Sequence, residues 1–532
     1  MKKILFLLSV VLLAGFAACK KSDFAESYPD PSKIPVSSMA KQFAGVLTSY
    51  TWSHEGNGRH GYVVPSYWNY FVVVRPILHF TQATGWQNAD NQYVPGAASI
   101  TDRWNDYYFL LAQYRELENI YSKLSPADQE AQRIFMIAAT IFFYDQTQKV
   151  VDLHGDIPWS EAGKLSANGG DYQASLPKYD DAASIYTKML DDLKALADEL
   201  NTINVPDGIL TSFKQQDLIN WGDLTMWKRY CNSLRLRMLT RVTEVPAFQT
   251  RVVAEIDEII NNPGEYPVVT SNAENIKVNV FDPGSEITAR GFRTGLEDWN
   301  GNLAGKAMID HMNANGDPRL RVMFEPGAEA GGIYTGLDPL MNRTTQGTMI
   351  ADGEIAIYNR STFSRNEYFP GVLITAAQVG FYMAEYYVRN SLAAEAKTAY
   401  ERGIEQSIEF YYWLRTLSND NTAGPVTAPN ASEINDYLNS DDVDWDQPTD
   451  KLSLLATQKW IHYSIIQPVE SWSEIRRLDA PSFSFEIDNA NQQSQPPLRW
   501  IYPAAEQVYN ARNYEAVASR DKLNTPIFWD ID

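Results

Sequence analysis

The stretch LLATQKWIHYSIIQPVESWSEIRRLDAPSF, residues 454–483, carries the clearest structural information in the chain. Leu455, Trp460 and Tyr463 recur at the spacing of one helix face. Pro468 ends this pattern, because proline cannot continue a helix begun before it, and a second short amphipathic segment follows. The stretch therefore predicts two consecutive helices.

The second of these helices contains Trp472 and the adjacent Arg476 and Arg477. After a polar loop at 489–495, the chain continues as PPLRWIYPAAEQVYNARNY at 496–514. A guanidinium group can bind a carboxylate through two parallel hydrogen bonds and can stack on an aromatic ring. We therefore expect these arginines to fix the packing of helices and loops, and not to form a reaction centre.

Further motifs occur in order along the chain: Ala-Ala-Cys at 17–19, HGDIPWSEA at 154–162, a helix with Asn232, Leu234 and Arg237, DPRL at 317–320, and QKW at 458–460. Together with the C-terminal segments they resemble the SusD/RagB-like nutrient-binding outer-membrane lipoproteins of Bacteroidota. This resemblance covers nearly all of the chain beyond its N-terminal signal. It implies a mainly α fold, with tetratricopeptide-like helix pairs as the scaffold, long irregular loops and a few short strands.

The N-terminus predicts a lipoprotein signal peptide over residues 1–18. Two lysines precede an apolar segment at 4–16 that is too short to span a bilayer, and two alanines precede Cys19. This pattern resembles a bacterial lipobox, so we expect acyl chains on Cys19, with 19–36 as a polar tether. A plain secretory signal that leaves Cys19 free is the alternative.

Residues 37–532 are expected to form one SusD-like domain, mainly helical over 37–261 and 370–532. Helical periodicity returns from Pro370, where we expect a helix to begin, and the paired spacing of alanines and tyrosines there suggests tetratricopeptide-like units. Between these regions, residues 262–369 are rich in Gly, Pro and Asn and predict a loop-rich insertion. Loops of this length are usually functional or carry small structure of their own.

Composition excludes some classes of function. The net charge of −21 would repel phosphate, so nucleic acid is not expected as a partner. Apart from Cys19, Cys231 is the only cysteine, so the fold has no intramolecular disulfide to rely on. Cys231 lies in a segment that predicts a helix, and we expect a buried structural thiol there.

Residues 51–100 set large aromatic rings in Gly-, Asn- and Pro-rich sequence. Such loops are typical of surfaces that bind flat, half-apolar ligands such as sugar rings or peptide side chains. The alternative for any single ring is a place in the core beneath the loops. Including the insertion, the predicted ligand-binding residues are Trp68, Trp86, Tyr93, Trp299 and Tyr334.

Two acidic clusters contain residue types found in reactive or metal sites. Asp152, His154, Asp156 and Glu161 are expected to cap helix ends and hold loops, because no nucleophile with its base accompanies them. The Asp-x-Asp-x-Asp at 442–446 lacks the later glycine and glutamate of a calcium loop, so a solvated acidic loop is favoured over a weak calcium site. No cofactor or metal is predicted.

The resemblance implies a binding protein and not an enzyme. Members of that family capture a nutrient, which is either a glycan or a peptide, and pass it to a partner SusC-like TonB-dependent transporter in the outer membrane. We expect lipid anchoring to that membrane, with the protein facing the cell exterior. A glycan-active hydrolase and an adhesive lipoprotein without a transport role stay as alternatives, although no common catalytic motif occurs in the chain.

Overall fold

A computed structural model describes residues 37–51, 59–447 and 450–531 of the chain. The predicted signal peptide, the predicted lipid attachment at Cys19 and the tether lie outside the described residues. No helix within those ranges is both long enough and apolar enough to cross a membrane.

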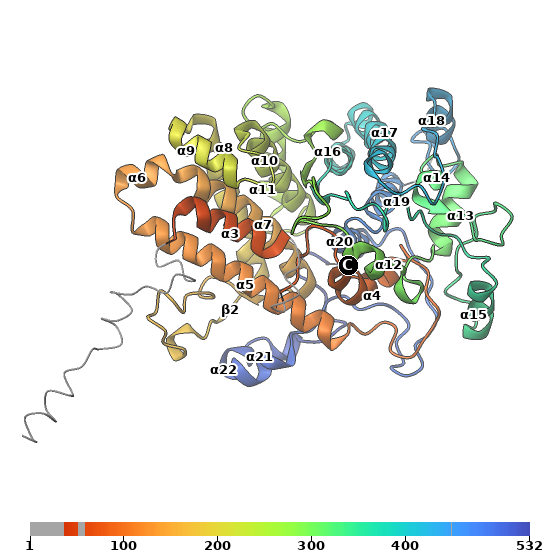
Figure 1. The fold of residues 1–532 in the computed structure, drawn as a ribbon, viewed down its shortest axis with the longest axis horizontal. Coiled ribbons are helices and arrows are strands. Elements are labelled where there is room, and N and C mark those ends of the chain that lie inside the picture. Colours follow the sequence, from red (N-terminus) through yellow and green to blue (C-terminus); the bar gives the residue numbers. More distant parts are fainter. Residues whose placement is uncertain (1–36, 52–58, 448–449, 532) are drawn as a thin grey trace, which may run out of the picture.

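The fold is mainly helical, as the sequence predicts (Figure 1). The α-helices are α3 (Met39–Thr51), α4 (Arg75–Phe80), α5 (Ala97–Ser122), α6 (Pro126–Ala131), α7 (Arg133–His154), α8 (Ala182–Thr202), α9 (Asp207–Gln216), α10 (Leu224–Arg241), α11 (Gln249–Asn261), α12 (Gly291–Glu297), α13 (Lys306–Asn315), α14 (Leu320–Met323), α15 (Arg343–Ala351), α16 (Ala376–Arg389), α17 (Ala393–Leu417), α18 (Ala431–Leu438), α19 (Lys451–Tyr463), α20 (Pro468–Leu478), α21 (Ala504–Tyr509) and α22 (Ala511–Tyr514). A π-helix, η2 (Asn69–Val73), precedes α4, and short 3₁₀ turns are η3 (Gln173–Ser175), η4 (Asn272–Glu274), η5 (Asp298–Asn300) and η6 (Ala518–Arg520).

Helices that follow one another in the chain pack as neighbours and form the scaffold. Contacts join α3 to α5, α5 to α7, α7 to α8, α8 to α10, and α10 to α11 and α16. From α16 the contacts continue to α17 and α19, and α20 packs back on α7 and α4. In Figure 1 the earlier helices fill one half of the molecule, and α13, α14, α15 and α18 lie at the other end. This succession of paired helices is the architecture that the family resemblance implies.

Helix α7 lies at the centre of the first half. Its run IFMIAATIFFY is apolar nearly all round, and almost every residue of the helix is buried. A helix that is apolar on every face needs neighbours on every face. Contacts with α3, α5, α8, α10 and α20 supply them.

Three short antiparallel strand pairs connect the helical parts. The pairs are β1 (Ile157–Pro158) with β2 (Tyr179–Asp180), β3 (Ile276–Val278) with β6 (Gly371–Ile374), and β4 (Phe324–Glu325) with β5 (Ile357–Tyr358). In the second pair, Val278 lies opposite Gly371 and Ile276 opposite Ile374, with a bulge between Ile276 and Lys277.

The predicted helix start at Pro370 is wrong. Residues 371–374 form strand β6, and α16 begins only after Thr375, whose hydroxyl accepts a hydrogen bond from the backbone N–H of Gln378 at 3.2 Å. The apolar run GVLI suits a buried strand as well as a buried helix, and periodicity cannot separate the two in so short a segment. Pairing with β3, which is distant in sequence, decides the outcome.

Arg477 anchors a buried ion cluster formed by Glu385, Lys459, Glu474 and Arg477. The two terminal nitrogens of Arg477 donate to the two oxygens of Glu385, both at 2.7 Å, and one also donates to Glu474 at 2.6 Å. Lys459 Nζ lies 2.6 Å from Glu385 and 2.7 Å from Glu474. The cluster joins α16, α19 and α20, so the predicted role of this arginine in packing is confirmed.

The neighbouring Arg476 also has the predicted role. Its guanidinium group stacks 3.8 Å from the ring centre of Trp472 and donates to the backbone oxygen of Leu498 at 2.6 Å. It thereby connects α20 to the segment that follows the polar loop.

Candidate ligand-binding groove

A groove of about 550 Å³ separates two segments that lie far apart in the sequence. One wall comes from residues 71–99, and the other from residues 299–303 with two side chains of α15. Trp86 and Trp299, both predicted from sequence as ligand contacts, line this groove together.

Close backbone contact brings the two tryptophans to the same groove. The N–H of Gly85 donates to the carbonyl of Leu303 at 2.8 Å, and Thr84 forms an antiparallel bridge with Ala304. A Cβ at position 85 would lie 2.7 Å from the carbonyl oxygen of Ala304 and 2.8 Å from the side chain of Leu337. Only glycine fits so close to another backbone, so Gly85 allows the walls to meet.

Trp86 forms part of the groove floor. Its ring is buried and stacks on His79, with 4.8 Å between ring centres. The indole N–H donates to Gln92 Oε1 at 3.0 Å. Ring stacking and this hydrogen bond fix the orientation of the indole before any ligand arrives.

Trp299 projects from the rim instead. Its side chain is 84% exposed, the highest exposure among the large apolar residues that the structure describes. Trp299 has φ 56°, and Asn300 has the same value. This left-handed region is unfavourable for residues with a Cβ, and two in succession hold the indole away from the core. Strain of this kind is often found at binding sites.

Arg75 holds the turn that carries Trp299. One terminal nitrogen of its guanidinium group donates to the carbonyl oxygens of Gly295 at 3.2 Å and Asp298 at 2.8 Å. The same group lies 4.4 Å from the ring centre of Phe71. Arg75 therefore connects α4 on one wall with the Trp299 turn on the other.

The loop after Trp86 is attached to the α15 region. Gln87 Nε2 donates to the carbonyl of Arg343 at 2.9 Å. Asn88 Nδ2 donates to the carbonyl of Pro339 at 2.8 Å, and the Asn88 backbone N–H donates to Gln346 Oε1 at 2.7 Å. These bonds attach the loop after Trp86 to the α15 part of the second wall.

The groove lining contains no paired acids among the described residues. Its charged side chains are Arg75 and Arg343, and no Asp or Glu is among the described residues that line it. Burial, with a smaller contribution from the charge of Arg75, lowers the pKa of His79 to about 3, so this ring is neutral at physiological pH. Glycoside hydrolysis by the common route needs two carboxylates on either side of the scissile bond. This lining can stack on a ligand and donate hydrogen bonds to it, but it does not supply that pair.

The other three predicted contact residues lie elsewhere. Trp68 is half-buried, stacks on His60 with 4.6 Å between ring centres, and donates to Asp102 at 3.0 Å. Tyr93 is fully buried, and its hydroxyl donates to the carbonyl of Glu486 at 2.7 Å. Tyr334 is half-buried against the core. None of the three lines the groove, and their roles as ligand contacts stay predictions.

Among the groove residues that sequence analysis did not single out are Phe71, Arg75 and His79. They come from η2 and α4, two short helical segments inside a region that composition presents as loop. The only local sign is the i, i+4, i+8 spacing of these positions, which is too short a pattern to identify a helix.

The acidic cluster around HGDIPWSEA has structural contacts. Asp152 accepts hydrogen bonds from Tyr186 at 2.5 Å and from the indole N–H of Trp529 at 2.9 Å. Asp156 accepts the backbone N–H of Ala182 at the start of α8, at 2.9 Å. These bonds agree with the interpretation that the cluster holds helix ends and loops.

His154 and Glu161 complete that cluster. His154 is fully buried, and burial, with lesser contributions from nearby arginines, lowers its pKa to about 3. Glu161 lies near the surface and accepts the backbone N–H of Lys178 at 3.3 Å.

The carboxylates at 442–446 have separate partners. Asp442 accepts from Asn315 Nδ2 at 3.2 Å, and Asp446 pairs with Lys397 at 2.6 Å. Across the part of the chain that the structure describes, no group of three or more Asp, Glu, His or Cys residues is placed to hold a metal ion.

The family model for SusD-like proteins, described as "Starch-binding associating with outer membrane", matches residues 74–503. The chain belongs to this family. No curated protein sequence matches this chain.

Solved structures share the fold. A SusD homolog from Parabacteroides distasonis is 22% identical, with a TM-score of 0.72, over 93% of this chain and 98% of that one. A chitin-binding SusD homolog from Flavobacterium johnsoniae is 20% identical, with a TM-score of 0.69, over 93% of this chain and 99% of that one. A protein described as chitin-binding is 21% identical, with a TM-score of 0.70, over 93% of this chain and all of that one.

Proposed function

We propose that this protein binds a glycan in the Trp86–Trp299 groove and passes it to a TonB-dependent outer-membrane transporter. The observation that carries the proposal is the placement of Trp299. A large indole stands exposed on the rim, in a strained backbone conformation, opposite a second indole in the floor. An exposed ring held in this way has no use in the core but offers a flat apolar face to a ligand.

The chemistry of the groove suits sugar rings. A pyranose has apolar C–H faces that pack on an indole, and hydroxyl groups at its edge that exchange hydrogen bonds with amides and guanidinium groups. Trp299 supplies the face, and Gln87, Asn300 and Arg343 supply polar groups on the rim. The family description and the chitin-binding relatives support a glycan over a peptide.

Titration calorimetry of the chain from Cys19 onward tests the ligand class. The panel comprises chitohexaose, maltohexaose, cellohexaose and a peptide digest. We expect at least one oligosaccharide to bind, and its length to be unchanged after prolonged incubation. Binding of the digest alone would favour a peptide ligand, and shortening of an oligosaccharide would favour the hydrolase alternative.

The transport role rests on family membership and on the lipobox-like sequence at Cys19. Lipid on Cys19 would hold the protein at the outer membrane, where capture can be followed by transfer to a SusC-like barrel. We expect a TonB-dependent barrel to co-purify in near-equal amount when the C-terminally tagged protein is solubilised gently from its native membrane. Recovery of the lipoprotein alone would contradict this part of the proposal and favour the adhesive alternative.

A further inference from the structure

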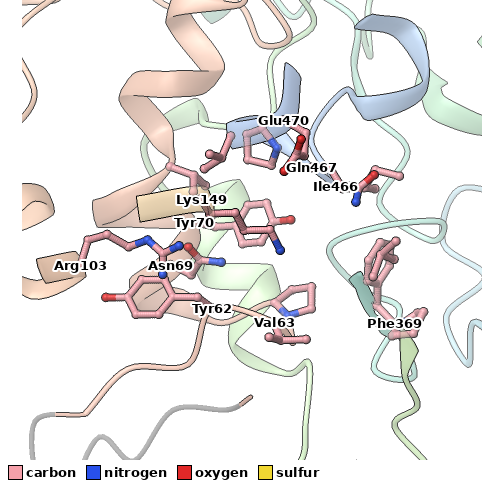
Figure 2. A pocket seen from close by; sticks show the side chains of 16 residues that line it. Tyr62, Val63, Asn69, Tyr70, Arg103, Lys149, Phe369, Ile466, Gln467 and Glu470 are labelled. Carbon is pink, nitrogen blue, oxygen red and sulfur yellow. The ribbon is translucent and has the colours of Figure 1, made fainter. Parts of the chain in front are cut away.

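A second cavity of about 60 Å³ lies on the other side of η2 (Figure 2). Asn69 and Tyr70 of this π-helix line the cavity, whereas Phe71 and Val72 line the glycan groove. The remaining walls come from the segment before η2, from α5, α7 and the β6 region, and from the start of α20. The two sites therefore share one short helical wall.

Arg103 of α5 is the unusual residue in this cavity. It is 3% exposed, its Nη1 has no hydrogen-bond partner, and no carboxylate among the described residues lies within 4.0 Å of it. The nearby Asp106 is bound instead by His60 and by the hydroxyl of Tyr62, each at 3.0 Å. Buried charges are normally paired, so a guanidinium group placed in this way lacks its expected counterion.

Arg103 remains charged although it is buried. The guanidinium group lies 4.4 Å from the ring centre of Tyr62 and 5.0 Å from that of Tyr50, which gives partial compensation through cation–π contact. Burial lowers the pKa of Arg103 to about 9, which still leaves it protonated at neutral pH.

Two buried oxygens in the same cavity lack donors. They are Asn69 Oδ1 and Gln467 Oε1. The orientation of the Gln467 amide is fixed, because its Nε2 donates to the carbonyl of Leu373 at 3.0 Å. Glu470 is already paired, since its Oε1 lies 3.7 Å from Arg237 Nε and its Oε2 accepts from Arg241 at 2.6 Å. Buried acceptors without partners are rare and destabilising.

The cavity therefore presents complementary groups and a limited volume. In Figure 2, Arg103, Asn69 and Lys149 lie along one side, Phe369 lies across from them, and Gln467 and Glu470 close the remaining edge. At roughly 10 to 15 Å³ for each water-sized group, 60 Å³ holds about four to six such groups. A molecule of that size with an anionic end and a donor end would satisfy the unpaired atoms.

We infer that this cavity is a second ligand site, separate from the glycan groove, for a small carboxylate that carries a hydrogen-bond donor on the neighbouring carbon. Its carboxylate binds the guanidinium group of Arg103. Its amino or hydroxyl group donates to the unpaired oxygens of Asn69 and Gln467. α-Amino acids and 2-hydroxy acids share this chemistry.

Titration calorimetry of the chain from Cys19 onward with L-alanine, L-lactate and acetate tests the inference. We expect L-alanine or L-lactate to bind at least about tenfold more tightly than acetate, which lacks the donor. The stronger of the two identifies the donor as an amino or a hydroxyl group. If neither binds at about 10 mM, or if acetate binds equally well, the inference is overturned and the cavity holds water only.

Variants separate a ligand role from a structural one. Arg103→Met should abolish binding, and Arg512→Met, which removes an exposed arginine of α22, should not. Because Arg103→Met can also unfold the protein, Asn69→Leu is the second test: it removes an oxygen that has no partner in the fold. We expect Asn69→Leu to weaken binding of the small acid at least about tenfold with little change in thermal stability. Unchanged binding in both variants would overturn the inference.

Glycan titration of the same variants keeps the two proposals distinguishable. We expect oligosaccharide binding in the groove to persist in Asn69→Leu. If no glycan binds the wild-type protein, that result would contradict the proposed function without bearing on the small-acid site.

Discussion

Replacement of Trp299 by alanine isolates the contribution of the exposed indole. Because the side chain is 84% exposed, its removal sacrifices little packing, and the free energy of unfolding should change by less than about 0.5 kcal/mol. A sugar stacked on one indole face would cover about 80 Å² of apolar surface. At about 25 cal/mol per Å² this contact contributes about 2 kcal/mol, so the affinity should fall about 30-fold.

The assay is titration calorimetry with the oligosaccharide that binds the wild-type protein most tightly. Trp221→Ala is the matched control, because Trp221 is also exposed, at 50%, and also has a positive φ, 57°, but does not line the groove. We expect Trp221→Ala to bind like the wild type. Unchanged affinity in Trp299→Ala, or an equal loss in both variants, would refute the assignment of the groove.

Four further outcomes are expected. Trp299→Gly should be at least as stable in urea as Trp299→Ala, since glycine adopts the left-handed conformation freely; lower stability would contradict the strain argument. Glu385→Gln should destabilise the fold by about 3 to 5 kcal/mol, because it breaks a buried ion cluster, and exposed Glu433→Gln should leave the urea midpoint unchanged. Burial raises the pKa of Glu474, but the charges of Arg477 and Lys459 outweigh this effect and hold that pKa below the ordinary value. The stability that this carboxylate contributes is therefore complete above pH about 4.3 and should be lost as the pH falls further. A urea midpoint that stays constant down to pH about 2 would contradict this expectation. Glycan affinity should be constant between pH about 5.5 and 8, since His79 is neutral throughout, and a twofold or larger change centred near 6.5 would contradict this.

The helical scaffold could be predicted because its determinants are local. Apolar spacing indicates helices in the first and last parts of the chain, and side-chain chemistry gives Arg476 and Arg477 their packing role. The partners could not be predicted. Glu385, which binds Arg477, lies on α16, and nothing in either segment specifies that the two helices meet. Asn232 shows the same division: its need for a crossing backbone follows from burial, but the carbonyl of Pro267 at 3.3 Å is known only from the fold.

Part of the candidate groove could be predicted. Ring-bearing loops drew attention to Trp86 and Trp299 as candidates, and the fold brings these two into one groove, while their role as ligand contacts stays a prediction. Their meeting depends on the close approach at Gly85, where one backbone passes another, and sequence alone does not place that contact. Residue type also cannot separate the exposed ring of Trp299 from the fully buried ring of Tyr93, since both occur in polar, turn-rich sequence.

The strand at 371–374 illustrates a different limit. Its apolar residues fit a helix and a strand equally well, and the choice is made by β3, almost a hundred residues earlier in the chain. Only the capping residues Thr375 and Gln378 mark locally where α16 begins.

A crystal structure of the chain from Cys19 onward, in complex with the oligosaccharide that binds most tightly, is the decisive experiment for the proposed groove. We expect a sugar ring stacked on the exposed face of Trp299, with the next rings running over Trp86 towards Arg343. A glycan bound on another face of the molecule, with the Trp86–Trp299 groove empty, would contradict it.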